Sequence, residues 1–498
     1  MNENYKQMKI KIFGLLAIIG MFASCTDLSD EVYSELLAEE YPENEIQAQL
    51  ITNNAYSQLQ SHIDGGWWFA QEITSDLIVA PTRGSDWDDG GKWRALHTHS
   101  WDNNHEYVNN MWRNFYNGVT ECNKAIEYLG DAETSKNAVA QMKVLRAYYY
   151  YLLIDNYGDV PYVTSFADAP ETPEKVSRAT VFNNIIADIE SVIDDLEGSS
   201  TSSVNQYTAY ALLAKLYLNA EVFTGTPMWE ECENYCDLII AGPYSLESNR
   251  LGAFVTENQN SPENIFTVPY DEDNYQGFIL HRRTLHYTNT ATFNARTTFW
   301  NGFCAQERLV DFFEDNDTRK AGLLLGQQFS SSGEQLFDTD AGNAPVVFTK
   351  EVPALRMDAS FTSAQIRFSG ARMVKFEIKS GVKDNLSNDL PIFRLADFKL
   401  MKAECQLRKT RGNLAIAKTE INDIRTAAGA TAWDDADITL DNLLDERGRE
   451  MWCEAHRRQD LIRFGKFTES WWEKSTDTEA NHLFPIPQWA IDSNPNLN

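Results

Sequence analysis

The segment LRAYYYYLLIDNYG, residues 145–158, gives the clearest indication of the fold. Its apolar and aromatic residues follow helical periodicity, and Gly158 marks the end of the predicted helix. A second segment, LAKLYLN at 213–219, again places a small alanine beside a tyrosine. Ala147 and Ala214 are separated by close to two periods of the roughly 34-residue helix-turn-helix repeat. The sequence therefore predicts paired helices that stack into a superhelix with one continuous core.

Helical periodicity dominates two regions of the chain, and a different pattern separates them. The predicted helices cover 105–129, 135–158, 178–196 and 205–223 in the first region, and 391–409, 412–429 and 440–465 in the second. Between them, short alternating runs are mixed with Gly, Ser, Asn and Asp, which predicts a loop-rich, partly β segment. We expect a mostly α fold, with a helical repeat scaffold over 46–250 and 390–498 and an irregular insertion over 251–389.

The first residues predict a secretory signal peptide over 1–24. Three lysines precede the apolar run IFGLLAIIGMFA at 12–23, which is too short to span a bilayer by itself. Ala23 and Ser24 before Cys25 resemble a bacterial lipobox, in which Cys25 becomes the lipidated first residue. The alternative is ordinary signal-peptidase cleavage with Cys25 incidental. An acidic tether over 25–45 follows, and its start, TDLSDE, resembles the signal that sends lipoproteins of the Bacteroidetes to the cell surface.

The charge and the cysteines narrow the possible functions. The formal net charge is −30, and no basic cluster offsets it, so a nucleic-acid backbone would be repelled. Of the six cysteines after Cys25, only Cys232 and Cys236 are close in sequence, and their spacing of four suits neither a zinc ribbon nor a redox pair. We expect all six to be buried free thiols. They are Cys122, Cys232, Cys236, Cys304, Cys405 and Cys453. With 43% hydrophobic residues, the chain can build a large core without disulfides.

Two polar segments stand out because they are rich in aromatic residues. The first, PTRGSDWDDGGKWRALHTHSW at 81–101, contains three tryptophans at no helical spacing and several helix-breaking residues. We expect it to form a long, ordered loop. The second, HRRTLHYTNTATFNARTTFWNGF at 281–303, contains Tyr287, Phe293, Phe299 and Trp300. Loops held by rigid elements often carry binding residues, so both segments are candidates for a ligand site.

Eight segments, in the same order along the chain, resemble successive blocks of the SusD/RagB family. They are LRAYYYYLLIDNYGDVPYV (145–163), ALLAKLYLNAEVFTGTPMW (211–229), SPENIFTVPYD (261–271), RLVDFFEDNDTRK (308–320), LPIFRLADFKLMKAECQLRK (390–409), INDIRTAAG (421–429), DERGREMWCEAHRRQDLIRFGKF (445–467) and LFPIPQWAIDSNPNL (483–497). This resemblance covers nearly the whole mature chain.

The resemblance implies a mostly α fold with tetratricopeptide-type helix pairs and an irregular ligand-binding face. It also implies a lipid-anchored protein at the cell surface that acts as the lid of a SusC-like TonB-dependent transporter in the outer membrane. Such proteins capture oligosaccharides and are not enzymes, so we expect neither catalytic residues nor a cofactor. An α-glucan is the leading expectation for the ligand, with fructans or other neutral polysaccharides behind it.

The comparison with starch-binding members of the family assigns candidate ligand residues. Arg83, Trp101 and Asn104 would come from the first polar segment, and Tyr287 and Trp300 would complete the aromatic surface. An aromatic plane can bury the axial C–H groups of a sugar, while Asn and Arg hydrogen-bond its hydroxyls. The alternative for Trp101 is that it anchors the loop to the helices.

For Trp87 and Trp93 we prefer the anchoring interpretation.

If RALHTHSW is extended, Ala95, His97, His99 and Trp101 share one face. A structural metal ion is an alternative, because His97 and His99 could bind it together with nearby Asp86, Asp88 and Asp89. The spacing fails for a calcium loop, because Gly90 falls one place early, and we expect no metal.

Two other classes of protein remain open. A lipid-anchored glycoside hydrolase would need two carboxylates facing each other across a cleft, but no signature in the sequence places them. A helical-repeat adaptor would bind protein alone.

In the charged block at 445–467, we expect Glu446 with Arg449, and Glu454 with Arg457, to form structural ion pairs on a helix, because each pair is three residues apart.

Overall fold

The computed structural model describes residues 44–498. The predicted signal peptide, Cys25 and all but the end of the tether lie outside the described residues. Within residues 44–498, no helix is both long enough and apolar enough to cross a membrane. The predicted division of the scaffold at residues 250 and 390 stays a prediction.

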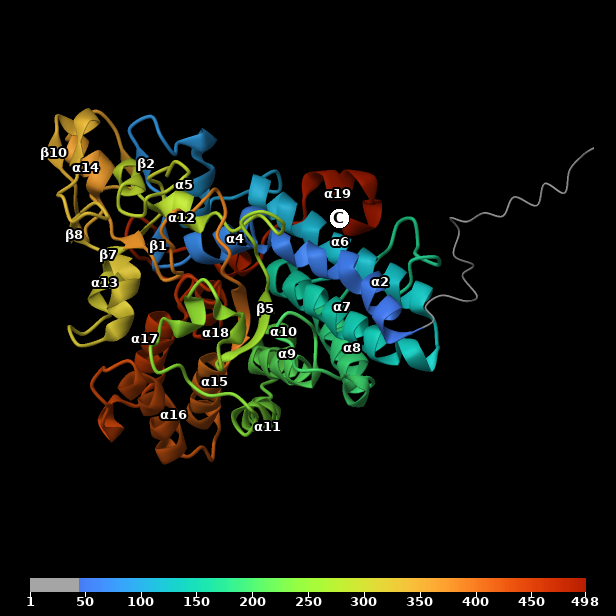
Figure 1. Cartoon of the computed structure of the whole chain (residues 1–498). Coiled ribbons are helices and arrows are strands. Elements are labelled where there is room, and N and C mark those ends of the chain that lie inside the picture. Colours follow the sequence, from blue (N-terminus) through green and yellow to red (C-terminus); the bar gives the residue numbers. More distant parts are fainter. Residues whose placement is uncertain (1–43) are drawn as a thin grey trace, which may run out of the picture.

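Helices dominate the structure, and most of them pack in neighbouring pairs (Figure 1). They are α2 (Glu45–Ser57), α3 (Ser61–Asp64), α4 (Trp67–Ile73), α5 (Lys92–His97), α6 (Glu106–Leu129), α7 (Lys136–Tyr157), α8 (Arg178–Glu190), α9 (Gln206–Leu218), α10 (Ala220–Thr224), α11 (Trp229–Ile240), α12 (Leu280–Thr284), α13 (Glu307–Asp311), α14 (Ser363–Phe368), α15 (Leu395–Arg408), α16 (Leu414–Ala427), α17 (Leu440–Met451), α18 (Arg457–Arg463) and α19 (Gln488–Ser493). The prediction of a mostly α fold with helix pairs is confirmed.

The strands are short, and all of them form two-stranded pairs within the described residues. The pairs are β1 (Ile78–Val79) with β6 (Cys304–Ala305), β2 (Thr82–Arg83) with β12 (Arg356–Met357), β3 (Val160–Pro161) with β4 (Lys175–Val176), β5 (Asn264–Val268) with β14 (Leu390–Arg394), β7 (Leu323–Leu324) with β13 (Arg372–Met373), β8 (Gly326–Gln327) with β11 (Val347–Phe348), and β9 (Phe337–Asp338) with β10 (Ala344–Pro345). Only β2 with β12 is parallel.

The tyrosine-rich helix α7 lies between α2, α6 and α8 (Figure 1). Because neighbours cover it on several sides, all four consecutive tyrosines, 148–151, are buried. A Cβ at Gly118 on α6 would lie 2.4 Å from the ring of Tyr149 on α7. Gly118 therefore allows the two helices to approach closely. The Tyr149 hydroxyl donates to the carbonyl of Ala55 at 2.9 Å, which ties α2 to the same pair.

Three sequence predictions about local structure need correction. The helix predicted from residue 391 begins at Leu395, because 390–394 pair with β5. The stretch 81–101 is not a loop without secondary structure, since it contains β2, a 3-10 turn and α5. RALHTHSW is consequently not extended: its first part is helical, and His99 has a left-handed backbone with φ of 55°. Its histidines and Trp101 do not share one strand face.

The cysteine prediction is confirmed for the described residues, because all six are free and buried.

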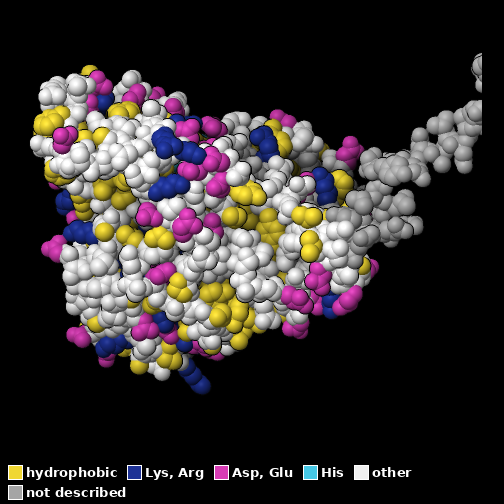
Figure 2. Space-filling model, in the orientation of Figure 1, with side chains coloured by type: hydrophobic (Ala, Val, Ile, Leu, Met, Phe, Trp, Pro, Cys, Tyr) yellow, Lys and Arg dark blue, Asp and Glu magenta, His cyan; other side chains and the backbone are white. Residues whose placement is uncertain are grey.

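On the face shown in Figure 2, charged side chains of both signs are spread between hydrophobic ones.

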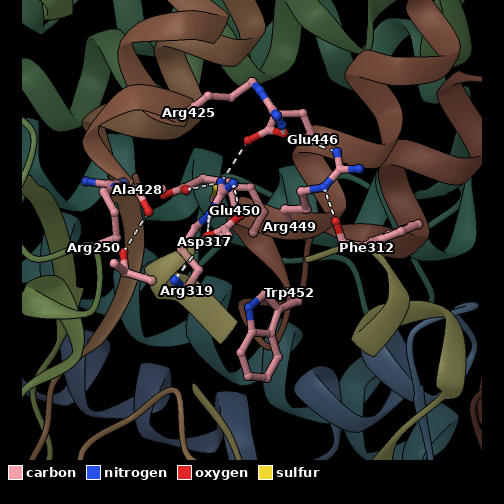
Figure 3. Close-up of polar contacts among 12 residues, drawn as sticks. Arg250, Phe312, Asp317, Arg319, Arg425, Ala428, Glu446, Arg449, Glu450 and Trp452 are labelled. Atoms are coloured by element: carbon pink, nitrogen blue, oxygen red, sulfur yellow. Dashed lines mark hydrogen bonds and ion pairs between the residues drawn. The ribbon is translucent and has the colours of Figure 1, made fainter. Parts of the chain in front are cut away.

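Buried ion pairs fix the insertion to α17, and we call these contacts the α17 ionic seam. Arg319 of the insertion lies 2.8 Å from Glu446 and 2.9 Å from Glu450 (Figure 3). Glu450 also pairs with Arg250 and, at 2.7 Å, with Arg394. Burial alone would raise the pKa of Glu450, but Arg250, Arg394 and Arg319 hold it well below its usual range. The seam therefore consists of fully charged groups inside the protein.

One of the two predicted ion pairs in this block is confirmed and one is wrong. Glu446 and Arg449 lie 3.1 Å apart on α17. Glu454 instead pairs with Arg394 and Lys375, and Arg457 pairs with Asp76 at 2.7 Å. The reason is that α17 ends at Met451 and the backbone turns through two left-handed residues, Cys453 and Ala455, before α18 begins.

Candidate ligand-binding surface

The two polar aromatic segments meet around Trp300, and we call this region the Trp300 surface. It comprises Asp86, Trp87, Arg282, Arg283, Tyr287, Trp300 and Arg367. The Trp87 indole Nε1 donates to the Trp300 carbonyl at 2.7 Å. A Cβ at Gly302 would lie 2.1 Å from the Trp87 ring, so a glycine is needed where the indole lies on the backbone. Both tryptophans remain half-exposed.

Trp300 is held next to α12 by backbone hydrogen bonds. Its N–H donates to the Arg282 carbonyl at 2.6 Å, and the Asn301 N–H donates to the Leu285 carbonyl at 2.9 Å. The Arg282 guanidinium carbon lies 4.3 Å from the Trp300 ring centroid, and that of Arg283 lies 5.4 Å away. The indole is therefore flanked by fixed hydrogen-bond donors.

Exposed carboxylates accompany these arginines. Arg282 pairs with Asp384 at 3.2 Å, and Arg283 pairs with Asp64 at 3.0 Å. Figure 2 shows Lys and Arg side chains gathered with Asp and Glu over the position of α12. Donors and acceptors thus stand side by side next to an aromatic plane. This combination suits a ligand with vicinal hydroxyl groups on a partly apolar ring.

Tyr287 joins the insertion to the first polar segment. Its hydroxyl donates to Asp86 Oδ2 at 2.7 Å, and the Arg367 guanidinium carbon lies 4.9 Å from its ring. Burial and the hydrogen bond to Asp86 raise the pKa of Tyr287 to about 12. Its hydroxyl therefore stays neutral, and the ring presents a fixed edge of the surface.

The structure places Arg83 in the interior, 3% exposed. All three guanidinium nitrogens are hydrogen-bonded within the protein: Nε to the Gly302 carbonyl at 3.2 Å, Nη1 to that of Ile366 at 2.9 Å and Nη2 to that of Ser369 at 3.0 Å. This placement does not support the predicted contact between Arg83 and a sugar. Arg83 instead supports the backbone that carries Trp87 and Trp300.

Trp101 and Asn104 lie apart from the Trp300 surface. Trp101 packs against Phe484 and His99, with ring centroids 4.7 Å and 5.0 Å away. Asn104 is exposed and donates to Asn103 at 3.1 Å. No described contact of Trp101 reaches Tyr287 or Trp300. These contacts favour the anchoring interpretation of Trp101, and its contact with a ligand stays a prediction.

The other two tryptophans of the first segment differ from each other. Trp93 is 1% exposed, its Nε1 donates to Asp89 at 2.7 Å, and its ring packs on Phe69, Tyr107 and Phe303. Trp93 is therefore an anchor. Trp87 also packs on Phe303 but reaches the surface beside Trp300. The sequence signal for Trp87 is its setting in SDWDDGG, where no apolar neighbour accompanies it.

The histidines and aspartates of this segment turn to separate partners. His97 Nε2 lies 2.8 Å from the Trp472 carbonyl, and His99 Nδ1 lies 2.5 Å from Asp477. Burial lowers the pKa of His97 to about 4 and that of His99 to about 2. Asp88 and Asp89 bind Arg94 and Trp93. Across residues 44–498, no group of three such side chains could hold a metal ion.

Comparison with known proteins identifies the family. A model described as the SusD family matches residues 364–481, and one described as starch-binding associating with outer membrane matches residues 33–218. The chain belongs to the SusD family. It is 26% identical to the starch-binding protein SusD of Bacteroides thetaiotaomicron, over 74% of this chain and 73% of that protein. It is 27% identical to SusD-like protein P2 of Formosa agariphila, over 97% and 96% of the two chains.

Solved structures share the fold. Surface glycan-binding protein A from Bacteroides thetaiotaomicron has a TM-score of 0.72 at 20% identity and covers 91% of this chain and 98% of its own. The same protein has also been solved in complex with laminarihexaose, with a TM-score of 0.71, 20% identity and coverage of 91% and 99%. At such low identity, these structures show the fold alone.

Proposed function

We propose that this protein binds neutral oligosaccharides at the cell surface without cleaving them. The observation that carries the proposal is the half-exposed Trp300 indole beside two arginine–carboxylate pairs. A sugar ring can lay its C–H face on the indole, while its hydroxyls donate to Asp64 and Asp384 and accept from Arg282 and Arg283. One relative is named for binding starch, and one structural neighbour was solved with laminarihexaose, and both ligands are neutral glucans. We keep an α-glucan as the leading ligand.

We also propose an outer-membrane location, with lipid attached to Cys25 and a SusC-like TonB-dependent transporter as partner. The matched family model whose description mentions the outer membrane supports this location. Because the thioether needs the cysteine sulfur, Cys25→Ser should release the protein from the membrane fraction. Gentle detergent extraction of the wild type should recover a large β-barrel protein in near-equal amount. Recovery of the protein alone would favour an adaptor that has no transporter partner.

Affinity electrophoresis across neutral and acidic polysaccharides tests glycan binding, and an assay for new reducing ends tests for cleavage. Trp300→Ala should weaken binding to the best glycan by about 1–3 kcal/mol, the scale of one large apolar side chain. Trp489→Ala is the matched control, because Trp489 is 40% exposed on α19, outside the Trp300 surface. If Trp300→Ala and Trp489→Ala bind alike, the assignment of the site is wrong.

Trp101→Ala separates the two interpretations of that residue. If Trp101 is an anchor, as its packing on Phe484 indicates, the variant melts at a lower temperature than the wild type. The molecules that remain folded then bind glycan with wild-type affinity. If Trp101 contacts the ligand, affinity falls while the melting temperature holds. Asn104→Ala, at an exposed position, sharpens this test because it leaves the core untouched.

A further inference from the structure

A cleft opens beside α13 and α17, and we call it the Trp471–Trp472 cleft. It has one lobe of about 440 Å³ and an adjoining lobe of about 180 Å³, and both are lined by Asp76, Arg308 and Trp471. Trp472 lines the larger lobe, and Asp445 lines the smaller one. None of its lining residues belongs to the Trp300 surface. Figure 1 shows α13 and α17 as neighbours on the left of the molecule.

The two tryptophans are held rigidly by a tight turn. Trp471 and Lys474 exchange backbone hydrogen bonds of 3.1 and 3.0 Å. The Lys474 ammonium lies 4.1 Å from the Trp471 ring centroid. Trp472 packs against the cluster that contains Leu355 and Met357, and its carbonyl contacts His97. Both tryptophans nevertheless remain half-exposed, so they form preorganised aromatic walls.

Arg308 extends between the two lobes. Its side chain is 48% exposed, with Nε 3.3 Å from Asp76 and Nη2 3.2 Å from Asp445. Burial alone would raise the pKa of Asp76, but Arg457 and Arg308 hold it below its usual value. Asp76 therefore stays ionised and keeps Arg308 in place. A guanidinium between two carboxylates offers both donors and acceptors to a pair of neighbouring hydroxyls.

We propose that the Trp471–Trp472 cleft is a second binding site for a neutral oligosaccharide. The volume of its larger lobe lies in the range of ligand pockets, and its walls are mostly apolar with a few convergent polar groups. The carboxylates on its walls, Glu307, Asp311, Asp441, Asp445 and Glu469 beside Asp76, outnumber Arg308 and Lys466. Anionic sugars are therefore disfavoured. The proposal rests on the proposed glycan binding but adds a separate location for it.

The two sites are close enough to act on one polysaccharide. Trp300 belongs to the first site and Gln306 lines the second. Since they are six residues apart, their backbones are separated by at most about 20 Å. A glycan chain engaged at one site would meet the other at high effective concentration. We therefore expect tighter binding of polymers than of short oligosaccharides.

NMR of the full mature chain carrying fluorinated tryptophan tests the second site. Trp300→Phe, Trp471→Phe and Trp472→Phe assign the three signals, and maltohexaose, laminarihexaose and an oligolysine peptide are the probes. We expect one hexaose to shift the signals of both Trp300 and Trp472. A shift at Trp300 alone overturns the second site and leaves the proposed function standing, whereas no shift with either hexaose overturns both. A Trp472 shift with oligolysine alone identifies a peptide cleft and overturns the glycan assignment.

Affinity for the polysaccharide gives an independent readout. Arg308→Ala should lower it about tenfold, which corresponds to the loss of one charge-assisted hydrogen bond. Arg411→Ala, at an exposed arginine between α15 and α16 and outside both sites, is the matched control. Both variants should melt at nearly the same temperature as the wild type, because Asp76 retains its pair with Arg457. If Arg308→Ala binds the polysaccharide as tightly as the wild type, the proposed contact of Arg308 with the sugar is wrong. If, in addition, neither hexaose shifts the NMR signal of Trp472, the cleft is not a sugar site.

Discussion

The contact between α6 and α7 and the α17 ionic seam are both buried, but they are built from opposite chemistry. At the first, the ring of Tyr149 packs over Gly118. The second places Glu450 among Arg250, Arg319 and Arg394. When apolar packing is reduced, the free energy of unfolding falls roughly in proportion to the contact that is lost. When a buried charge loses its partner, the free energy of unfolding falls steeply, because the remaining charge is buried without compensation. The contact of Tyr149 with Gly118 should thus fail in proportion to what is removed, whereas the pairs that join Arg319 of the insertion to α17 should fail abruptly.

The largest expected effect comes from Glu450→Gln. This change leaves several buried guanidinium groups without a full counter-charge, so we expect a loss of about 3–5 kcal/mol in the free energy of unfolding. Denaturant titration measures it. Glu469→Gln, at an exposed glutamate with a surface partner, should change stability by less than about 0.5 kcal/mol. Equal losses in both variants would contradict the importance of the seam.

An intermediate effect is expected at the apolar contact. Gly118→Ala pushes a methyl group into the ring of Tyr149, and overpacking of this kind costs about 1–3 kcal/mol. Asn117→Ala is the control, since Asn117 is exposed on the same helix. Thermal melts of the two variants should differ by several degrees. If Gly118→Ala melts like Asn117→Ala, the helices separate more easily than the structure indicates.

A pH-dependent effect is expected at Glu72, a buried carboxylate without a cationic pair. Its Oε1 accepts from the Ala455 N–H, while Oε2 has no partner among the described residues. Burial raises the pKa of Glu72 to about 7. Because the folded state holds this proton more tightly than the unfolded state, Glu72 makes stability fall as pH rises from about 4.5 to about 7.

In that pH window, the slope due to Glu72 is at most about 1.4 kcal/mol per pH unit. Glu72→Gln should remove this contribution, which denaturant titrations of both proteins at several pH values would measure. The seam carboxylates act below that window: their pKa values are lowered, so their stabilisation is fully present above about pH 4.5 and is lost as pH falls further. An unchanged pH profile in Glu72→Gln would show that Glu72 is already ionised in the folded protein.

The sequence predicted the helical scaffold because periodicity and helix-ending glycines are local signals. It misplaced the start of α15, since an apolar run such as LPIFRL suits a strand and a helix equally. It also paired Glu454 with Arg457, because nothing in the sequence marks the left-handed turn at Cys453 and Ala455. These errors arise where tertiary contacts, not neighbours in the chain, decide the backbone.

The candidate site was predicted only in part. Tyr287 and Trp300 could be found from their polar surroundings. Arg83 was assigned to the ligand from the family resemblance, but its burial depends on carbonyl groups more than two hundred residues away. The pair Trp471–Trp472 in ESWWEK was missed, although two tryptophans among charged residues are a signal that sequence reading can use.

The α17 ionic seam also sets an order of assembly. A chain that is synthesised from its N-terminus presents Arg250 and Arg319 long before Glu446 and Glu450. Until the last part of the chain arrives, these arginines have their local partners, Glu263 and Asp317, but lack the carboxylates of α17, and the insertion cannot settle in its final place. The surface that carries Trp300 therefore matures last, and a chain cut short before α17 would retain many of its helices but lose the fixed position of that surface.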